Sequence, residues 1–94
     1  MSTVTITGKF NNSNNNVLSL EVFQLSPGGY SFQKKYHGSF KEVFRDLLPD
    51  NTYHVEFTGS TTGTVDIEIE GDIEANISER YESFFMGDFN LKTK

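Results

Sequence analysis

Hydrophobic and polar residues alternate with a period of two along most of this chain. A β-strand has that period, because successive side chains point to opposite faces of the sheet. The run over 65–77 is too long for one strand of a small domain, so we expect a tight hairpin or a bulge centred on Gly71 to divide it. The pattern then predicts about seven short antiparallel strands, in the segments 3–10, 17–25, 30–36, 53–57, 65–77 (divided) and 83–91.

Residues that favour turns separate these segments. The tract Asn11–Asn16 predicts a hairpin loop, because asparagine tolerates positive φ and its amide can hydrogen-bond the local backbone. Ser26–Gly29 predicts a type II turn, since proline presets φ at the first central position and glycine accepts positive φ at the second. Loops are also expected at Gly59–Gly63 and at the polar segment Ser78–Glu82. The resulting spacing between turns is typical of a β-sandwich.

One segment has a different period. Apolar residues in Ser39–Leu48 recur at i, i+3, i+4, i+7 and i+8, which predicts a short amphipathic helix. Ser39 and Glu42 match a capping box, and Pro49 would end the helix. A strand is the competing interpretation of the same residues. The expected fold class is therefore mostly β: one antiparallel sandwich domain over residues 1–94, with one short helix near residues 39–48.

The segment Leu47–Val55 resembles the L-x-P-x-x-x-Y-x-V corner of fibronectin type III-like domains. It also resembles the L-x-P-G-x-Y turn of transthyretin-like and carboxypeptidase regulatory-like sandwiches, with Asp50 where glycine is common. The resemblance implies an Ig-like or prealbumin-like sandwich in which Tyr53, just after Pro49, forms a tyrosine corner. In such a corner the hydroxyl group bonds the backbone a few residues upstream. No function is implied, because these folds host many functions.

The composition excludes several classes of protein. The chain has no cysteine, so it has neither a disulfide, nor a thiolate metal site, nor a thiol nucleophile. Its formal net charge of −5 argues against a nucleic-acid partner, because phosphates would repel such a surface. The basic residues that gather in the sequence are interpreted first as a solvated face and second as an anion or partner site: Lys34, Lys35, Lys41 and Arg45.

The sequence shows no targeting signal. No apolar run approaches the roughly 20 residues of a membrane helix. The N-terminus lacks the charged and apolar regions of a secretory signal. We therefore expect a soluble cytoplasmic protein with no membrane partner, or a secreted one if a signal has been removed.

Catalytic motifs are missing from the sequence. Nucleophilic catalysis needs a base held against a hydroxyl group, and the two histidines, His37 and His54, lie in no nucleophile motif. The glycine pair at 28–29 precedes a strand pattern rather than a helix, so it does not predict a phosphate-binding loop. We expect no catalytic residue and no cofactor. The alternative is a small enzyme whose site is assembled from His37, His54 and carboxylates.

Acidic residues alternate along the segment 66–72. Carboxylates at i and i+2 of a strand project from one face, about 6 to 7 Å apart. One hypothesis is a Ca²⁺ site or a docking surface for a basic partner, because hard cations take several carboxylate oxygens. The other, which we favour, is a solvated strand face whose charges discourage pairing with another chain. The four residues of this acidic ladder are Asp66, Glu68, Glu70 and Asp72.

Several large apolar residues fall on the outer faces of the expected strands. Such residues can form a contact surface for a protein, a sugar ring or a second copy of the chain. Alternatively, the predicted helix covers them and makes a second core layer. Our leading hypothesis is a non-catalytic module that binds a protein or a carbohydrate through its loops and this aromatic face, and the second is a self-associating structural subunit, a homo-oligomer. The candidate binding residues are Phe23, Tyr81, Phe84 and Met86.

Overall fold

The computed structural model describes residues 1–25 and 29–94, and its regular structure consists of β-strands. The predicted type II turn falls on Ser26, Pro27 and Gly28, which lie outside the described residues. None of the residues described belongs to a helix of the length and apolarity that a membrane crossing requires. The six strands are β1 (Ser2–Phe10), β2 (Val17–Gln24), β3 (Ser31–Tyr36), β4 (Phe40–Leu47), β5 (Thr52–Gly71) and β6 (Ile77–Lys92).

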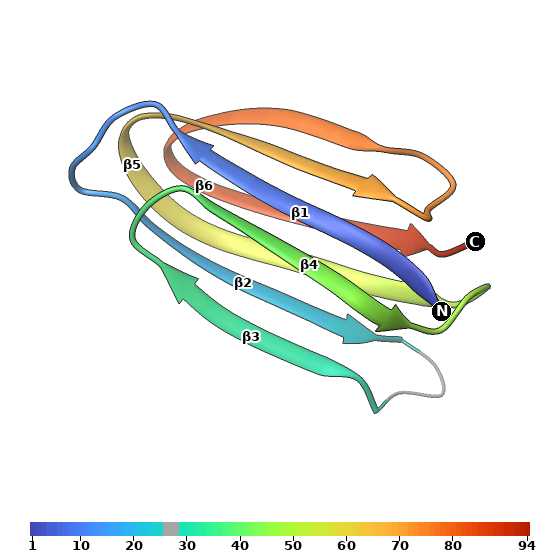
Figure 1. The fold of residues 1–94 in the computed structure, drawn as a ribbon. Coiled ribbons are helices and arrows are strands. Elements are labelled where there is room, and N and C mark those ends of the chain that lie inside the picture. Colours follow the sequence, from blue (N-terminus) through green and yellow to red (C-terminus); the bar gives the residue numbers. More distant parts are fainter. Residues whose placement is uncertain (26–28) are drawn as a thin grey trace.

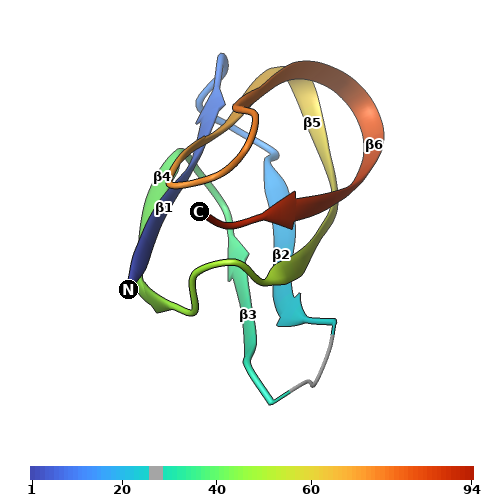
Figure 2. The ribbon, with the colours of Figure 1, turned by 90° about the vertical axis from the view of Figure 1, so that its right-hand side faces the viewer.

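Every named strand pairs antiparallel with its neighbours, which confirms the prediction of a mostly β, antiparallel domain. The strand order is β3-β2-β5-β1-β4, and β6 lies along β5 (Figure 1). The first half of β5 pairs with β2 and the second half with β1. The sheet therefore curls like half a barrel, and β6 follows β5 round the curl (Figure 2).

The curl is centred on an irregularity in β5. Ser60 pairs with Phe84, and the next pair is Thr64 with Glu82, so residues 61–63 of β5 lie opposite the single residue Ser83. The predicted loops at Gly59–Gly63 and Ser78–Glu82 are both wrong, because these segments continue β5 and β6. The polar residues of 59–63 lie at the bend of β5, and those of 78–82 lie on β6, which pairs with β5 on one side. Side chains at both places can reach water. The part of the chain that the structure describes forms six strands instead of about seven.

The predicted helix at 39–48 is also wrong, because this segment contains β4, and the competing strand interpretation is the correct one. Ser2 pairs with Leu47 and Val4 with Phe44, so β1 advances by two residues while β4 advances by three. This bulge places Phe44 and Leu47 on the same buried face at the spacing of a helix. The half-buried Glu42 between Phe40 and Phe44 further masks the period of two.

The core combines aliphatic side chains with a smaller number of aromatic rings. The ring of Phe57 packs against Tyr81, Phe85 and Phe89 of β6, at centroid distances of 5.4, 6.3 and 6.0 Å. Between β3 and β4, where no ladder forms, aromatic rings close the gap. Tyr36 stacks on Phe40 at 3.9 Å, and Phe32 meets Phe44 edge-on at 5.0 Å.

The connection between β4 and β5 has the contact of a tyrosine corner. The buried Tyr53 hydroxyl group accepts a hydrogen bond from the backbone N–H of Leu48, at 2.8 Å. Pro49 lies between the two partners, and Asp50 has a φ of 59°, the left-handed conformation that glycine favours. β5 ends at Gly71, where a break was predicted, and the φ of Gly71 is 130°. Both turns fix where β5 begins and ends.

Candidate functional site

A polar cluster on the outer face of β5 and β6 combines residues that the sequence does not show to be neighbours. His54 pairs with Asn90 across the two strands, and Glu56 pairs with Asp88. Because alternate residues of a strand share a face, all four side chains project from the same side of the sheet. We call these four residues the His54 cluster.

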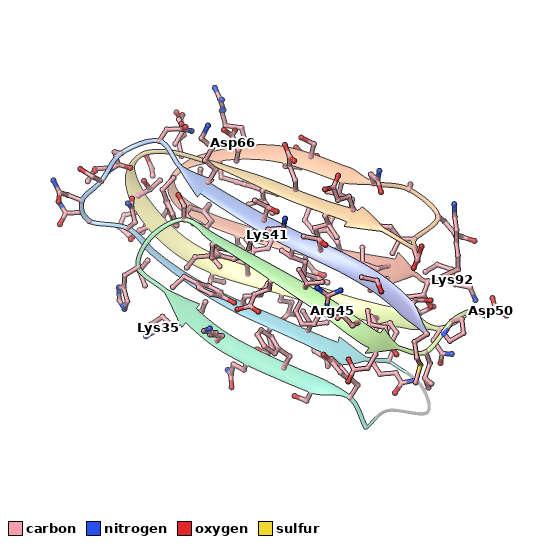
Figure 3. All side chains as sticks on the ribbon, in the orientation of Figure 1. Lys35, Lys41, Arg45, Asp50, Asp66 and Lys92 are labelled. Carbon is pink, nitrogen blue, oxygen red and sulfur yellow. The ribbon has the colours of Figure 1, made fainter. Side chains whose placement is uncertain are left out.

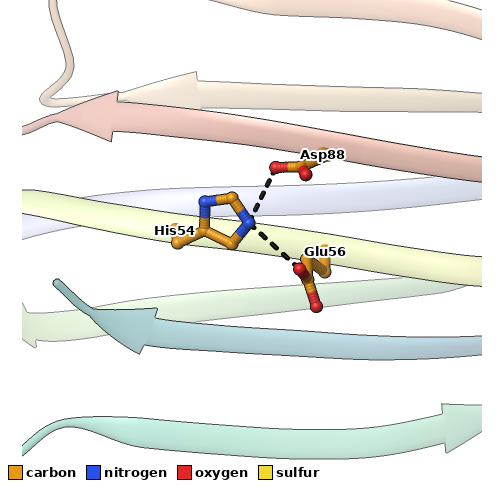
Figure 4. A group of neighbouring side chains, drawn as sticks. All are labelled: His54, Glu56 and Asp88. Carbon is orange, nitrogen blue, oxygen red and sulfur yellow. Dashed lines mark hydrogen bonds and ion pairs between the residues drawn. The ribbon is translucent and has the colours of Figure 1, made fainter.

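The imidazole ring of His54 joins the cluster together (Figure 4). Its Nε2 atom lies 2.7 Å from Asp88 Oδ1 and 3.2 Å from Glu56 Oε1. The Nδ1 atom lies 2.6 Å from Asn90 Oδ1. Phe23 of β2 covers one side of the imidazole, with 5.0 Å between ring centroids. The histidine side chain is 15% exposed, whereas the Asp88 side chain is 61% exposed, so the cluster opens towards solvent on the carboxylate side.

The cluster has an excess of negative charge. Hydrogen bonding to Asn90, followed by the carboxylates of Asp88 and Glu56, raises the pKa of His54 above its usual value, although partial burial acts in the opposite direction. Glu21 of β2 pairs with Glu56 on the other side of β5. Three carboxylates therefore occupy one row across β2, β5 and β6, and like charges placed directly opposite one another destabilise a sheet.

The sequence contained part of the signal for this cluster. The spacing of two between His54 and Glu56, and between Asp88 and Asn90, placed each pair on one face of its strand. The spacing does not show that these two segments lie side by side, because their pairing depends on the long β5–β6 hairpin. The other histidine, His37, is exposed in the connection between β3 and β4.

The acidic ladder lies on β5 and its following turn, away from the His54 cluster. Asp66 accepts hydrogen bonds from Arg80 Nε at 2.7 Å and from Asn11 Nδ2 at 3.2 Å. Asp72 accepts one from the Thr3 N–H at 2.9 Å. Within residues 1–25 and 29–94, His54, Glu56 and Asp88 are the group of three whose possible ligand atoms lie within 4.8 Å of one another, and no ladder residue joins such a group. A Ca²⁺ site at the ladder stays a prediction.

We expect Asp66 to titrate below the usual range of aspartate. Hydrogen bonds from Arg80 and Asn11 stabilise its ionised form and lower its pKa. A depressed pKa contributes stability at pH values above the unfolded-state pKa, and this contribution is lost as the pH falls through the folded-state pKa. Carboxyl ¹³C chemical shifts recorded from pH 7 to pH 2 measure the midpoint. The Arg80→Ala variant should return it towards the ordinary value, and an unchanged midpoint would contradict this assignment.

The four candidate aromatic-face residues do not form one surface. Phe84 is 90% exposed and Met86 is 72% exposed, both on β6. Phe23 is half-buried against His54, and Tyr81 packs against Phe57 and Phe85 at the margin of the core. The alternative of a covering helix is wrong, since the part of the chain that the structure describes contains none. Of the four candidates, therefore, Phe84 and Met86 are the exposed ones.

Phe84 borders a hollow at the bend of β5. The hollow has a volume of about 340 Å³. Two of its residues that are not glycine adopt left-handed backbone conformations: Asn15 with a φ of 61° and Ser83 with a φ of 58°. Residues in such conformations are uncommon and gather at functional sites. We call this feature the Phe84 hollow, and its lining residues are Asn15, Ser60, Thr61, Thr62, Ser83 and Phe84.

The asparagine tract is a loop, but the prediction of a hairpin is wrong, because β1 and β2 both pair with β5 and not with each other. The tract is bound to the bend of β5. The buried hydroxyl group of Thr61 lies 2.9 Å from Asn12 Oδ1 and 2.8 Å from Asn16 Oδ1. Asn12 Nδ2 also donates to the backbone carbonyl of Asn14, at 2.6 Å. These bonds hold the tract in one position beside Phe84.

The two candidate sites are therefore the His54 cluster and the Phe84 hollow, at separate places on the outer surface. The tyrosine-corner resemblance rests on the short segment Leu47–Val55. No protein-family model matches this chain, and neither does any curated protein or any solved structure.

Proposed function

We propose that this chain is a non-catalytic binding module that recognises a neutral carbohydrate at the Phe84 hollow. The observation that carries the proposal is a 90% exposed aromatic ring at the border of a hollow whose lining has no charged side chain. A large apolar side chain left in water at this exposure is unfavourable, so a surface that retains one is a candidate contact site.

The chemistry of the lining suits a sugar. One face of a pyranose ring presents C–H groups, which pack on an aromatic ring, while its hydroxyl groups need hydrogen-bond partners around the edge. The amide of Asn15 and the hydroxyl group of Ser83 offer both donors and acceptors. The Thr62 hydroxyl group, in contrast, already donates to the Asn14 carbonyl and accepts from Asn12 Nδ2. A charged ligand would find no ionic partner among these side chains. The volume of about 340 Å³ lies within the range of small-molecule sites.

The hollow is organised before a ligand arrives. Thr61 is 6% exposed and Asn16 is 7% exposed, and their mutual hydrogen bond ties the β1–β2 connection to the bend of β5. A site whose loops are already fixed loses less conformational entropy on binding. This network supports recognition by the loop and Phe84 together.

We expect the Phe84→Ala variant to lose binding to its glycan by about five- to thirteenfold, because packing against an aromatic ring contributes on the order of 1 to 1.5 kcal/mol. The wild-type protein is first screened on an array of neutral and charged glycans, and the affinity for a selected glycan is then measured by calorimetry. Met86→Ala is the matched control, since Met86 is also exposed on β6 but does not line the hollow.

The proposal fails if no neutral glycan binds to the wild-type protein, or if Phe84→Ala and Met86→Ala lose affinity equally. If the chain binds a protein and no glycan, the ligand is a protein, which is the other ligand class that the sequence suggested. Because Phe84 is almost fully exposed, its removal should leave the melting temperature nearly unchanged, so a loss of binding will not reflect unfolding.

Self-association is a second candidate function, and the free edge of β6 favours it. This 16-residue strand pairs with β5 only, so one side of its backbone lacks a strand partner among the described residues. Exposed Glu79 and Glu82 make the edge acidic. The opposite edges carry more exposed basic than acidic residues: Lys35 on β3 and Lys41 and Arg45 on β4 (Figure 3), against Asp46 on β4. Of the four basic residues noted in the sequence, Lys34 is paired with Glu42, at 3.2 Å.

A second copy would therefore dock its β3–β4 edge against β6. We expect light scattering to show a mass that rises with protein concentration and falls with added salt, because salt screens attraction between exposed charges. A Lys41→Glu/Arg45→Glu variant reverses the charge of one edge and should remain monomeric. A strictly monomeric wild-type protein at high concentration and low salt would remove this candidate.

A further inference from the structure

We propose that the His54 cluster binds a first-row divalent metal ion, with Zn²⁺ as the probe. The ligand atoms are His54 Nε2, Asp88 Oδ1 and Glu56 Oε1, and all three lie within 4.8 Å of one another. This site is separate from the Phe84 hollow and does not depend on the function proposed there.

The distances between ligand atoms are slightly shorter than those around a bound ion. In tetrahedral geometry, Zn²⁺ bonds to nitrogen and oxygen of about 2.0 to 2.2 Å place neighbouring ligand atoms about 3.3 to 3.6 Å apart. His54 Nε2 lies 3.2 Å from Glu56 Oε1 and 2.7 Å from Asp88 Oδ1. The ion can enter if both carboxylates withdraw slightly, and the Asp88 side chain, which has the shorter distance, is 61% exposed.

The imidazole of His54 has the orientation that a metal ligand needs. Its Nδ1 atom is 2.6 Å from the amide oxygen of Asn90, an acceptor, so Nδ1 donates a hydrogen bond to Asn90. Nε2 faces the carboxylates of Asp88 and Glu56, and a metal ion bound there would replace the proton on Nε2 while the bond from Nδ1 to Asn90 stays in place. Metal-binding histidines in proteins use such a second hydrogen bond to fix the tautomer and the ring direction. Phe23 packs against the ring at 5.0 Å and further limits its rotation.

The charge of the surrounding sheet favours a cation. Glu21, Glu56 and Asp88 form one row across three strands. Among the residues that the structure describes, no lysine or arginine forms an ion pair with Glu56 or Asp88. A divalent ion would neutralise two of these carboxylates and remove a repulsion between directly opposite residues.

The donor set selects the kind of metal. An imidazole nitrogen with two carboxylate oxygens suits Zn²⁺ and neighbouring transition metals, whereas Ca²⁺ and Mg²⁺ prefer sites made only of oxygen. Three protein ligands on a half-exposed face leave the remaining positions to water.

Calorimetric titration of the whole chain with ZnCl₂ tests the proposal. We expect one Zn²⁺ per chain, and at least a tenfold loss of affinity in His54→Ala. His37→Ala is the matched control, because the other histidine is exposed in a turn, and it should bind like the wild type. Absence of binding in the wild type, or a larger loss in His37→Ala than in His54→Ala, overturns the proposal.

Two further measurements keep the test independent of folding. Asp88→Asn changes an exposed carboxylate at almost constant shape, and we expect it to lose at least tenfold in Zn²⁺ affinity, whereas Glu68→Gln on the acidic ladder should lose none. In NMR spectra of the wild type, the imidazole signals of His54 should shift at one equivalent of Zn²⁺, and those of His37 should not. Binding of Ca²⁺ as tightly as Zn²⁺, or unchanged affinity in Asp88→Asn, would contradict the assigned ligands.

Discussion

Replacing Phe57 by alanine is expected to lower the free energy of unfolding by about 3 to 5 kcal/mol, as for other large-to-small substitutions in cores. Phe57 is 2% exposed, and its ring contacts three aromatic residues of β6. Opposite it stands Gly87, where any Cβ atom would overlap the ring. The cavity left by the ring would have no neighbour able to fill it without moving β6.

Urea denaturation followed by tyrosine fluorescence or circular dichroism measures this change. Phe84→Ala makes the same substitution on the same sheet but removes an exposed ring, so it should change the free energy of unfolding by less than about 0.5 kcal/mol. A loss below about 1.5 kcal/mol for Phe57→Ala would show that β6 does not depend on this ring. Because β6 carries both Phe84 and Asp88, the variant should also weaken both proposed binding sites.

Replacing Gly71 by alanine is expected to lower the free energy of unfolding by about 2 to 3 kcal/mol. The φ of Gly71 is 130°, which residues with a side chain rarely adopt, and a Cβ atom there would overlap the backbone carbonyl oxygen of Thr3. The neighbouring Asp72 N–H donates to that same oxygen at 2.9 Å, so β1 cannot move aside without losing a hydrogen bond. The end of β5 and the start of β1 would have to separate.

The matched control for Gly71 is Gly38. A Cβ atom at Gly38 would meet no atom within 4 Å, and its φ lies outside the left-handed range. We expect Gly38→Ala to change stability by less than about 0.5 kcal/mol in the same urea experiment. Equal losses in the two variants would mean that neither the backbone conformation of Gly71 nor its contact with Thr3 limits stability.

The outward positions of Phe84 and Met86 could be predicted, because alternation along 83–91 places them opposite Phe85 and Leu91. The Phe84 hollow could not be predicted from the sequence. Asn15 and Thr62 come together there only because β1 and β2 both pair with β5, on the two sides of its bend. The helix prediction failed for a related reason. A bulge changes the spacing of buried residues from two to three, and the cause of that change lies in the register between β4 and β1.

The amino-acid sequence by itself determined the class of the domain and the inward face of most strands, because both follow from local alternation of polar and apolar residues. Only the tertiary structure decided that β5 and β6 continue through a bend, because a strand tolerates polar residues where its neighbouring strand supplies hydrogen bonds. It also decided which residues come together in the two candidate sites. His54, Glu56 and Asp88 meet only because β6 returns along β5 in one particular register, and register depends on contacts between residues far apart in the chain.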